Sequence, residues 1–169
     1  YFPNKQIISR TSATMTHRIA FKDYVKRTHR LADALTKLGM TRGTKVGTFA
    51  WNHHRHLEAY FAIPCSGAIL HTINIRLAPE HIIYIINHAQ DEILLIDGDL
   101  FPLVEPALAH LKSVKHIIVM SDDKTAPESS FPNVYSYEQL LEEADESFAF
   151  PDDLDENLQA GMCYTSATT

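Results

Sequence analysis

The residues best suited to chemistry in this sequence are four hydroxyl side chains near its carboxyl terminus. Thr165, Ser166, Thr168 and Thr169 follow directly after the apolar segment 161–164. A strand that leads into small and hydroxyl residues suits a phosphate-holding loop, because hydroxyls and unhindered backbone N–H groups can converge there on one anion. The pattern therefore predicts the start of a phosphate-binding loop. Hydroxyl clusters are also common in ordinary loops, so the pattern alone does not identify the ligand.

Histidine is the second residue type that could carry chemistry, and the sequence contains 10 of them. His53 and His56 lie three positions apart in the first turn of an expected helix, where they would share a face and could share a metal ion. Arg55 lies between them and no carboxylate or cysteine joins them at ligand spacing, so we predict no metal site there. Other histidines stand singly among apolar residues and are interpreted as core or rim residues: His71, His81 and His88.

Several common catalytic patterns are absent from the sequence. It contains neither a Gly-x-Gly-x-x-Gly dinucleotide fingerprint nor a Gly-x-x-x-x-Gly-Lys-Ser/Thr phosphate loop, and no Ser, His and acid set stands out. The carboxylate pairs at 142–143 and 152–153 are interpreted as solvated faces and loops. We therefore predict no catalytic acid, base or nucleophile among these residues.

Composition and charge limit the classes of partner. An apolar fraction of 45% and a charged fraction of 21% are typical of a soluble globular protein, and no apolar run approaches the ~20 residues of a transmembrane segment. Residues 1–60 carry 11 Lys or Arg and 3 Asp or Glu, whereas the remainder carries 4 and 18. A basic first third can indicate nucleic-acid binding, but five of its cations form the polar face of one amphipathic helix, so we expect a solvated face and no nucleic-acid partner. Those five are Lys22, Lys26, Arg27, Arg30 and Lys37.

The two cysteines, Cys65 and Cys163, lie far apart in apolar surroundings. We interpret them as small buried hydrophobic residues in a reducing compartment. The expected location is therefore the cytoplasm, with peripheral association with a membrane left open.

Strand-like and helix-like patterns alternate along the chain. Two short opening strands are expected at 5–10 and 17–21, and apolar strands follow at 45–50, 67–73, 93–96 and 117–120. Helices are expected at 22–38, 53–64, 80–88, 102–111 and 137–144. Short apolar strands that alternate with helices are typical of a mostly parallel sheet with helices on both faces, so the predicted fold class is α/β.

Apolar spacing and capping residues predict the faces and ends of these helices. The first helix should bury a stripe at three- and four-residue spacing (Val25, Thr28, Ala32, Leu35 and Leu38) and end at Gly39 in a left-handed cap. Asn52 should cap the second helix, whose expected buried edge is Leu57, Tyr60, Phe61 and Pro64. The third helix, at 80–88, is apolar almost all round and should be largely buried. Ser136 and Gln139 form a capping box for the last helix.

A resemblance to a known family covers nearly the whole chain. The segment Tyr-Thr-Ser-Ala-Thr-Thr at 164–169 resembles the opening of the adenylate-forming enzyme motif, Tyr-Thr-Ser-Gly-Thr-Thr-Gly-x-Pro-Lys-Gly. The blocks 51–62, 67–80 and 85–89 are similar to the fatty-acyl-CoA synthetase branch, which uses medium- or long-chain acyl substrates. The chain is thus identified as a member of the adenylate-forming (AMP-binding) superfamily, with the loop 122–133 the least informative part.

The resemblance implies a function and a site. Enzymes of this family use ATP to convert a carboxylic acid to an acyl adenylate, which then passes to coenzyme A. The implied cofactors are ATP, Mg²⁺ and coenzyme A, the implied substrate is a fatty acid, and members of the branch can form homodimers through the N-terminal domain. The family's hydroxyl-rich loop holds the β- and γ-phosphates, which assigns nucleotide binding to Thr165, Ser166, Ala167, Thr168 and Thr169, with Thr165 also next to Mg²⁺.

Two positions depart from the family pattern. Ala167 replaces the usual Gly, which costs about 1 kcal/mol if the backbone φ there is positive and little otherwise. Ala78 stands where the family commonly has a capping Ser or Thr, and a weaker cap costs about 0.5–2 kcal/mol of stability.

The resemblance further implies that residues 1–169 are one incomplete N-terminal domain of a larger enzyme and are inactive alone. Its expected parts are opening strands (1–21), an α/β core (22–121), a variable loop (122–133), a helix with an acidic linker (134–156), and a strand with the start of the phosphate loop (157–169). Two other functions stay open: a fatty acyl-AMP ligase that stops at the adenylate, and a non-catalytic α/β binding or interaction module.

Overall fold

A six-stranded parallel sheet forms the centre of the molecule. The computed structural model describes residues 2–10 and 15–165, and the strand order in the sheet is β7-β6-β5-β3-β4-β8, with every neighbouring pair parallel. Its strands are β3 (Lys45–Phe49), β4 (Ile69–Thr72), β5 (Ile93–Asp97), β6 (His116–Met120), β7 (Val134–Ser136) and β8 (Gly161–Cys163). The predicted α/β class and the mostly parallel sheet are confirmed, although the sequence analysis did not predict the short strand β7.

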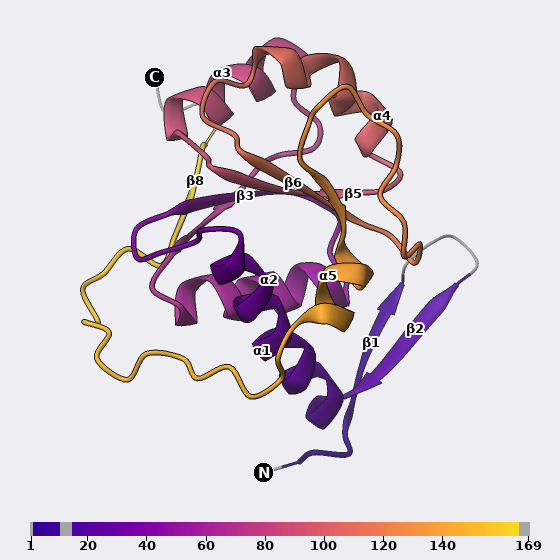
Figure 1. The fold of residues 1–169 in the computed structure, drawn as a ribbon, viewed down its shortest axis with the longest axis vertical. Coiled ribbons are helices and arrows are strands. Elements are labelled where there is room, and N and C mark those ends of the chain that lie inside the picture. The colour runs from indigo at the N-terminus through magenta and orange to yellow at the C-terminus, as the bar shows by residue number, and fades with distance from the viewer. Residues whose placement is uncertain (1, 11–14, 166–169) are drawn as a thin grey trace.

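Helices cover both faces of this sheet (Figure 1). One face carries α1 (Phe21–Lys37), α2 (His54–Cys65) and α5 (Tyr137–Glu143), and the other carries α3 (Pro79–Ala89), α4 (Phe101–Val104) and the 3₁₀ helix η1 (Glu105–His110). Along β5, Ile93 and Leu95 join the first core, whereas Leu94 and Ile96 join the second. Burial on both faces explains why the strand is apolar without alternation.

The opening strands form a separate hairpin. β1 (Gln6–Arg10) and β2 (Thr16–Ala20) pair antiparallel as a two-stranded sheet, with Ile8 opposite Arg18. This confirms the two predicted opening strands. The hairpin lies beside α1, α2 and α5 (Figure 1), and β1 contacts α2.

The connections diverge between β3 and β5. The chain passes from β3 through α2 to β4 on one side, and then through α3 to β5 on the other side of β3. Because all strands are parallel, their carboxyl ends meet at one edge of the sheet. In open α/β sheets ligands bind along this edge, and the point where the connections diverge is the usual place.

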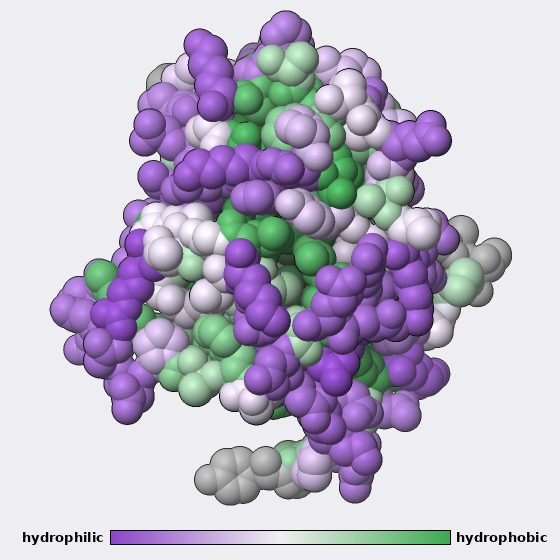
Figure 2. Space-filling model, viewed as in Figure 1, coloured by the Kyte–Doolittle hydropathy of each residue, from purple (hydrophilic) through white to green (hydrophobic). Residues whose placement is uncertain are grey.

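Polar side chains dominate the rim of the face seen in Figure 2, and apolar ones gather toward its centre. None of the helices within residues 2–10 and 15–165 is long and apolar enough to cross a bilayer.

The buried side of α1 matches the predicted stripe only in part. Thr28, Ala32 and Leu35 are buried as expected, but Val25 is 48% exposed, and Tyr24 and Leu31 point inward instead. The polar face is also not wholly solvated, because Arg27 is partly buried and pairs with acids on α2 and α5. Gly39, two residues after the end of α1, has φ +95°, which confirms the predicted left-handed cap.

The buried side of α2 was wrongly predicted. Its cap is His53 rather than Asn52, and Tyr60 and Phe61 are about half exposed. The helix packs Ala59, Ala62 and Ile63 against the sheet, and it also buries the charged side chains of Arg55 and Glu58. Partners on other helices neutralise these charges, which a local apolar pattern does not reveal.

Three further expectations are corrected in part. Cys65 and Cys163 are exposed, because one ends α2 and the other lies on the edge strand β8. The helix expected at 102–111 is α4 followed by the 3₁₀ helix η1. On α3, expected to be largely buried, Ile82, Ile85 and Ile86 are buried but Tyr84 is 60% exposed. Ser136 does cap α5, since its hydroxyl oxygen accepts from the Gln139 N–H over 3.4 Å.

Candidate active site

The expected phosphate loop begins at the end of the edge strand β8. This strand pairs with β4, with Gly161 opposite Leu70. Tyr164 and Thr165 therefore leave the sheet at the edge where the other parallel strands also end, and Thr165 is exposed there. The remaining predicted site residues lie outside the described residues: Ser166, Ala167, Thr168 and Thr169.

Tyr164 is anchored by side chains from two other elements. Its hydroxyl oxygen lies 2.6 Å from Nδ1 of His88, in the last turn of α3. Its ring centroid lies 5.3 Å from that of His71 on β4. Burial, with contributions from Asp91 and Tyr84, raises the pKa of Tyr164, so the hydroxyl stays protonated. His71 and His88 were interpreted from the sequence as single core or rim residues, and the structure brings both to Tyr164.

A buried, hydrogen-bonded histidine–aspartate pair lies next to this tyrosine. His71 Nδ1 and Asp91 Oδ2 are 2.7 Å apart, and both side chains are fully buried. A Cβ atom at Gly47 would lie 3.0 Å from Asp91 Oδ2 and 2.5 Å from the Leu94 side chain, so the strand needs glycine there. Burial raises the pKa of Asp91, and the hydrogen bond with His71 opposes that rise. A glycine inside a strand is a sign of close approach, and it was the available sequence signal for this pair.

A groove of about 390 Å³ opens beside Tyr164, at the ends of β3, β4 and β8. Its walls combine the rings of Trp51 and Tyr60 with the polar side chains of Asn74 and Arg76. Aromatic walls with a few polar groups are typical of small-molecule sites. The groove therefore adjoins the position from which the hydroxyl-rich segment departs.

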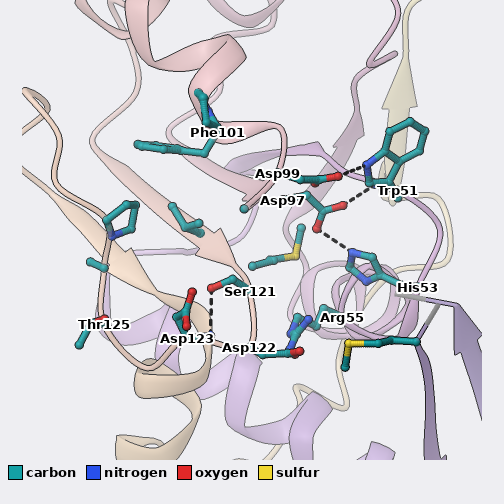
Figure 3. A pocket seen from close by; sticks show the side chains of 17 residues that line it. Trp51, His53, Arg55, Asp97, Asp99, Phe101, Ser121, Asp122, Asp123 and Thr125 are labelled. Atoms are coloured by element: carbon teal, nitrogen blue, oxygen red, sulfur yellow. Dashed lines mark hydrogen bonds and ion pairs between the residues drawn. The ribbon is translucent and has the colours of Figure 1, made fainter. Parts of the chain in front are cut away.

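A second hollow, of about 750 Å³, lies where the connections diverge, at the ends of β3, β5 and β6 (Figure 3). Asp97 is central to it, because one carboxylate oxygen accepts from the Trp51 N–H over 2.7 Å and the other lies 2.6 Å from His53 Nε2. Asp99 accepts from the Trp51 indole N–H over 3.0 Å. Arg55 reaches the same hollow and pairs with Asp122. Four polar side chains of this hollow are thus paired within the protein: His53, Arg55, Asp97 and Asp99.

His53 is a structural residue in this arrangement. Its Nδ1 accepts from the His56 N–H over 3.3 Å and so caps α2, which leaves Nε2 to carry the proton that bonds Asp97. His56 turns elsewhere, with Nε2 3.0 Å from the Thr48 hydroxyl oxygen. Within the described part of the chain, no group of three or more His, Cys, Asp or Glu side chains is placed to hold a metal ion.

A network of charged side chains joins α2 to α1 and α5. Arg27 on α1 donates to Glu58 over 2.7 Å and to Glu138 on α5 over 2.8 Å, and Arg55 also donates to Glu138. The Tyr137 hydroxyl donates to Glu58 over 2.5 Å. Burial works to raise the pKa of Glu138, but the two guanidinium groups outweigh it and lower that pKa to about 2. The network therefore holds α1, α2 and α5 together, next to the edge of the sheet where both hollows lie.

Comparisons with known proteins agree with this fold. The chain is 44% identical over 169 residues to a long-chain-fatty-acid–CoA ligase of Thermus thermophilus, covering 99% of this chain and 29% of that protein. It is 40% identical to a 3-methylmercaptopropionyl-CoA ligase of Ruegeria lacuscaerulensis, covering all of this chain and 31% of the relative. The crystal structure of an anthranilate CoA ligase in complex with anthranoyl-AMP superposes with a TM-score of 0.81 at 22% identity, over 90% of this chain and 28% of that one.

These matches have two consequences. The chain spans about three tenths of the length of the curated relatives it matches, and the structural likeness supports the fold alone. The model of the family described as AMP-binding enzyme matches residues 2–169. The chain therefore belongs to the AMP-binding enzyme family.

Proposed function

We propose that the full-length protein activates a fatty acid with ATP and transfers the acyl group to coenzyme A. The observation that carries this proposal is the family match over residues 2–169 together with the course of β8, which leads Tyr164 and Thr165 to the carboxyl edge of the sheet. In this reaction the fatty-acid carboxylate attacks the α-phosphate, pyrophosphate leaves, and the thiol of coenzyme A then displaces AMP from the acyl adenylate.

The proposed nucleotide site is the segment that starts at Thr165. Negative charge grows on the phosphates during the first step, so the protein must present hydrogen-bond donors to them. Hydroxyls and backbone N–H groups of a small-residue loop supply such donors. The residues proposed to contact the β- and γ-phosphates are Thr165, Ser166, Ala167, Thr168 and Thr169.

A magnesium ion fits this site as a companion of the nucleotide. Mg²⁺ is usually held by substrate phosphates, water and one or two protein oxygens rather than by a protein cage. The exposed Thr165 is suited to offer one hydroxyl oxygen of that kind, and no protein cage is found in residues 2–10 and 15–165. When bound, the ion would neutralise charge on the phosphates.

The proposal is tested with the full-length protein and a panel of acids: medium- and long-chain fatty acids, 3-methylmercaptopropionate and anthranilate. We expect acid-dependent release of AMP and pyrophosphate, with acyl-CoA formed when coenzyme A is present. Acyl adenylate that accumulates with or without coenzyme A would instead indicate a fatty acyl-AMP ligase. A protein that consumes no ATP with any acid would indicate a non-catalytic module.

The proposal extends to assembly and location. The family resemblance implies a homodimer, and exposed apolar side chains on α1 and α2 (Phe21, Val25 and Phe61) are compatible with a contact surface. The proposed cytoplasmic location comes from the two cysteines, which are free. Light scattering from the purified full-length protein at several concentrations tests the assembly, and a monomeric mass throughout would contradict it.

A further inference from the structure

The strand that leads to the proposed nucleotide site is short. Within the described residues, β8 has three residues and pairs with β4. The chain leaves the sheet directly after Cys163. Side-chain contacts just beyond the strand therefore help to determine the direction in which the chain continues.

The Tyr164 side chain supplies a second attachment just after the strand. Its hydrogen bond with His88 spans 76 positions of sequence and joins the carboxyl end of β8 to the carboxyl end of α3. The two rings meet edge to face, with centroids 5.8 Å apart and an angle of 82°. Tyr164 also packs against the core between α3 and the sheet.

The side chain on which the Tyr164 ring packs is itself held in place by a buried partner. His71, which contacts the Tyr164 ring, is fully buried and paired with the fully buried Asp91. Removing one member of a buried hydrogen-bonded pair is unfavourable because the polar group of the other is left without its partner. Gly47 leaves room for this pair, and a side chain there would collide with Leu94 and Asp91. The pair therefore holds a fixed position against which the tyrosine packs.

We propose that Tyr164, His88, His71 and Asp91 form a positioning cluster that sets where Thr165 and the residues after it meet ATP. The inference rests on the proposed function of this segment. Tyr164 acts through the loop that follows it, so it is a positioning residue rather than a catalytic one. Misplacement of a reacting group by about 1 Å can cost up to 100-fold in rate, so loss of the anchor should appear in nucleotide use before it appears in stability.

The decisive variant in the full-length protein is Tyr164→Phe, which removes the hydroxyl group and keeps the ring. We expect KM for ATP to rise about tenfold and kcat for pyrophosphate release to fall severalfold, while KM for the fatty acid and the melting temperature stay close to those of the wild type. His88→Leu should act similarly, and it should add little in the Tyr164→Phe background because the two residues share one bond. His88→Gln, whose amide can bond the phenol, should restore part of the loss.

A matched control exists at the opposite side of the sheet. Tyr135 on β7 lies with its hydroxyl oxygen 3.4 Å from His116 Nδ1, so it forms a second tyrosine–histidine pair that is remote from β8. Tyr135→Phe should leave the kinetic constants for ATP unchanged. An ATP KM within twofold of wild type in Tyr164→Phe would overturn the inference, as would an equal loss for all substrates that accompanies a lower melting temperature.

Failure of this inference is distinguishable from failure of the proposed function. If the wild-type protein releases AMP and Tyr164→Phe behaves like it, only the positioning cluster is refuted. If the wild-type protein releases no AMP, equilibrium binding of ATP still tests the cluster: weaker binding by Tyr164→Phe supports it and equal binding refutes it. A wild-type protein that neither releases AMP nor binds ATP refutes both.

Discussion

The two hollows at the carboxyl edge of the sheet differ in what their polar groups do. In the hollow between β3, β5 and β6, the Asp97 carboxylate bonds to His53 and to the Trp51 backbone, so it is used within the protein. In the groove beside β8, Tyr164 is anchored to His88, and the exposed Thr165 follows it into the proposed phosphate loop. The general rule for parallel sheets favours this edge for ligands. The course of β8 toward the hydroxyl-rich segment is what makes the groove the candidate binding site.

The strongest test of this comparison removes the first proposed phosphate contact. Thr165→Val keeps the size and branching of the side chain and deletes the hydroxyl group. We expect acid-dependent pyrophosphate release to fall about 100-fold, which is the usual effect of losing one well-placed group that stabilises developing charge. The melting temperature should hardly change, because Thr165 is exposed. Pyrophosphate release within threefold of wild type would remove Thr165 from the site.

The complementary test removes the central carboxylate from the hollow at the ends of β3, β5 and β6. Asp97→Ala deprives the Trp51 N–H and the His53 ring of their acceptor in a nearly fully buried position. We expect a loss of about 2–4 kcal/mol in the free energy of unfolding, measured by urea denaturation, with kcat/KM for ATP within about threefold of wild type per folded molecule.

Asp99→Ala is the control for that experiment. Asp99 bonds the exposed Trp51 indole, so its loss should cost less than about 1 kcal/mol, as is usual for solvent-exposed polar contacts. A large effect of Asp97→Ala on KM for ATP, without a change in stability, would make the hollow around Asp97 part of the nucleotide site and erase the distinction between the two regions.

A smaller effect should be a pH dependence of stability that arises from His54, next to the hollow around Asp97. His54 is 1% exposed, stacks on His17 at 3.9 Å, and has an Nδ1 atom with no hydrogen-bond partner among the described residues. Burial, then the charges of Arg55 and of His17, lower its pKa to about 2. Because the unfolded chain binds a proton near pH 6.5 and the folded protein does not, stability should fall as pH drops below 6.5.

The variant His54→Phe isolates this contribution, since the ring can still stack on His17. Between pH 7.5 and 5.5 the wild-type protein should lose about 1 kcal/mol more stability than the variant, measured by urea denaturation at each pH. His110→Gln, at an exposed position on η1, should follow the wild-type curve. Parallel curves for wild type and His54→Phe would show that His54 takes up a proton in the folded state.

Local sequence patterns predicted the sheet but not the polar contacts between elements. Short apolar strands and glycine or serine caps are local signals, and they located five of the six sheet strands and the left-handed end of α1. The buried side of α2 depends on Arg27 and Glu138, which are distant in sequence from Arg55 and Glu58, so apolar spacing wrongly predicted that Tyr60 and Phe61 are buried. The local motif at 164–169 was enough to identify Thr165 as a site residue. The bond between Tyr164 and His88 joins residues that are distant in sequence, so only the structure revealed it.

The smallest expected effect concerns Ala167, which stands where the family pattern has glycine. Ala167→Gly in the full-length protein should leave ATP–pyrophosphate exchange equal to wild type or up to about fivefold faster, because relief of a positive φ at one residue is worth about 1 kcal/mol. Equal rates would mean that the loop adopts a backbone that alanine tolerates, and faster exchange would mean that alanine strains it. Loss of exchange in Ala167→Gly would contradict the assignment of this segment to ATP, because glycine satisfies every backbone requirement that a phosphate loop imposes.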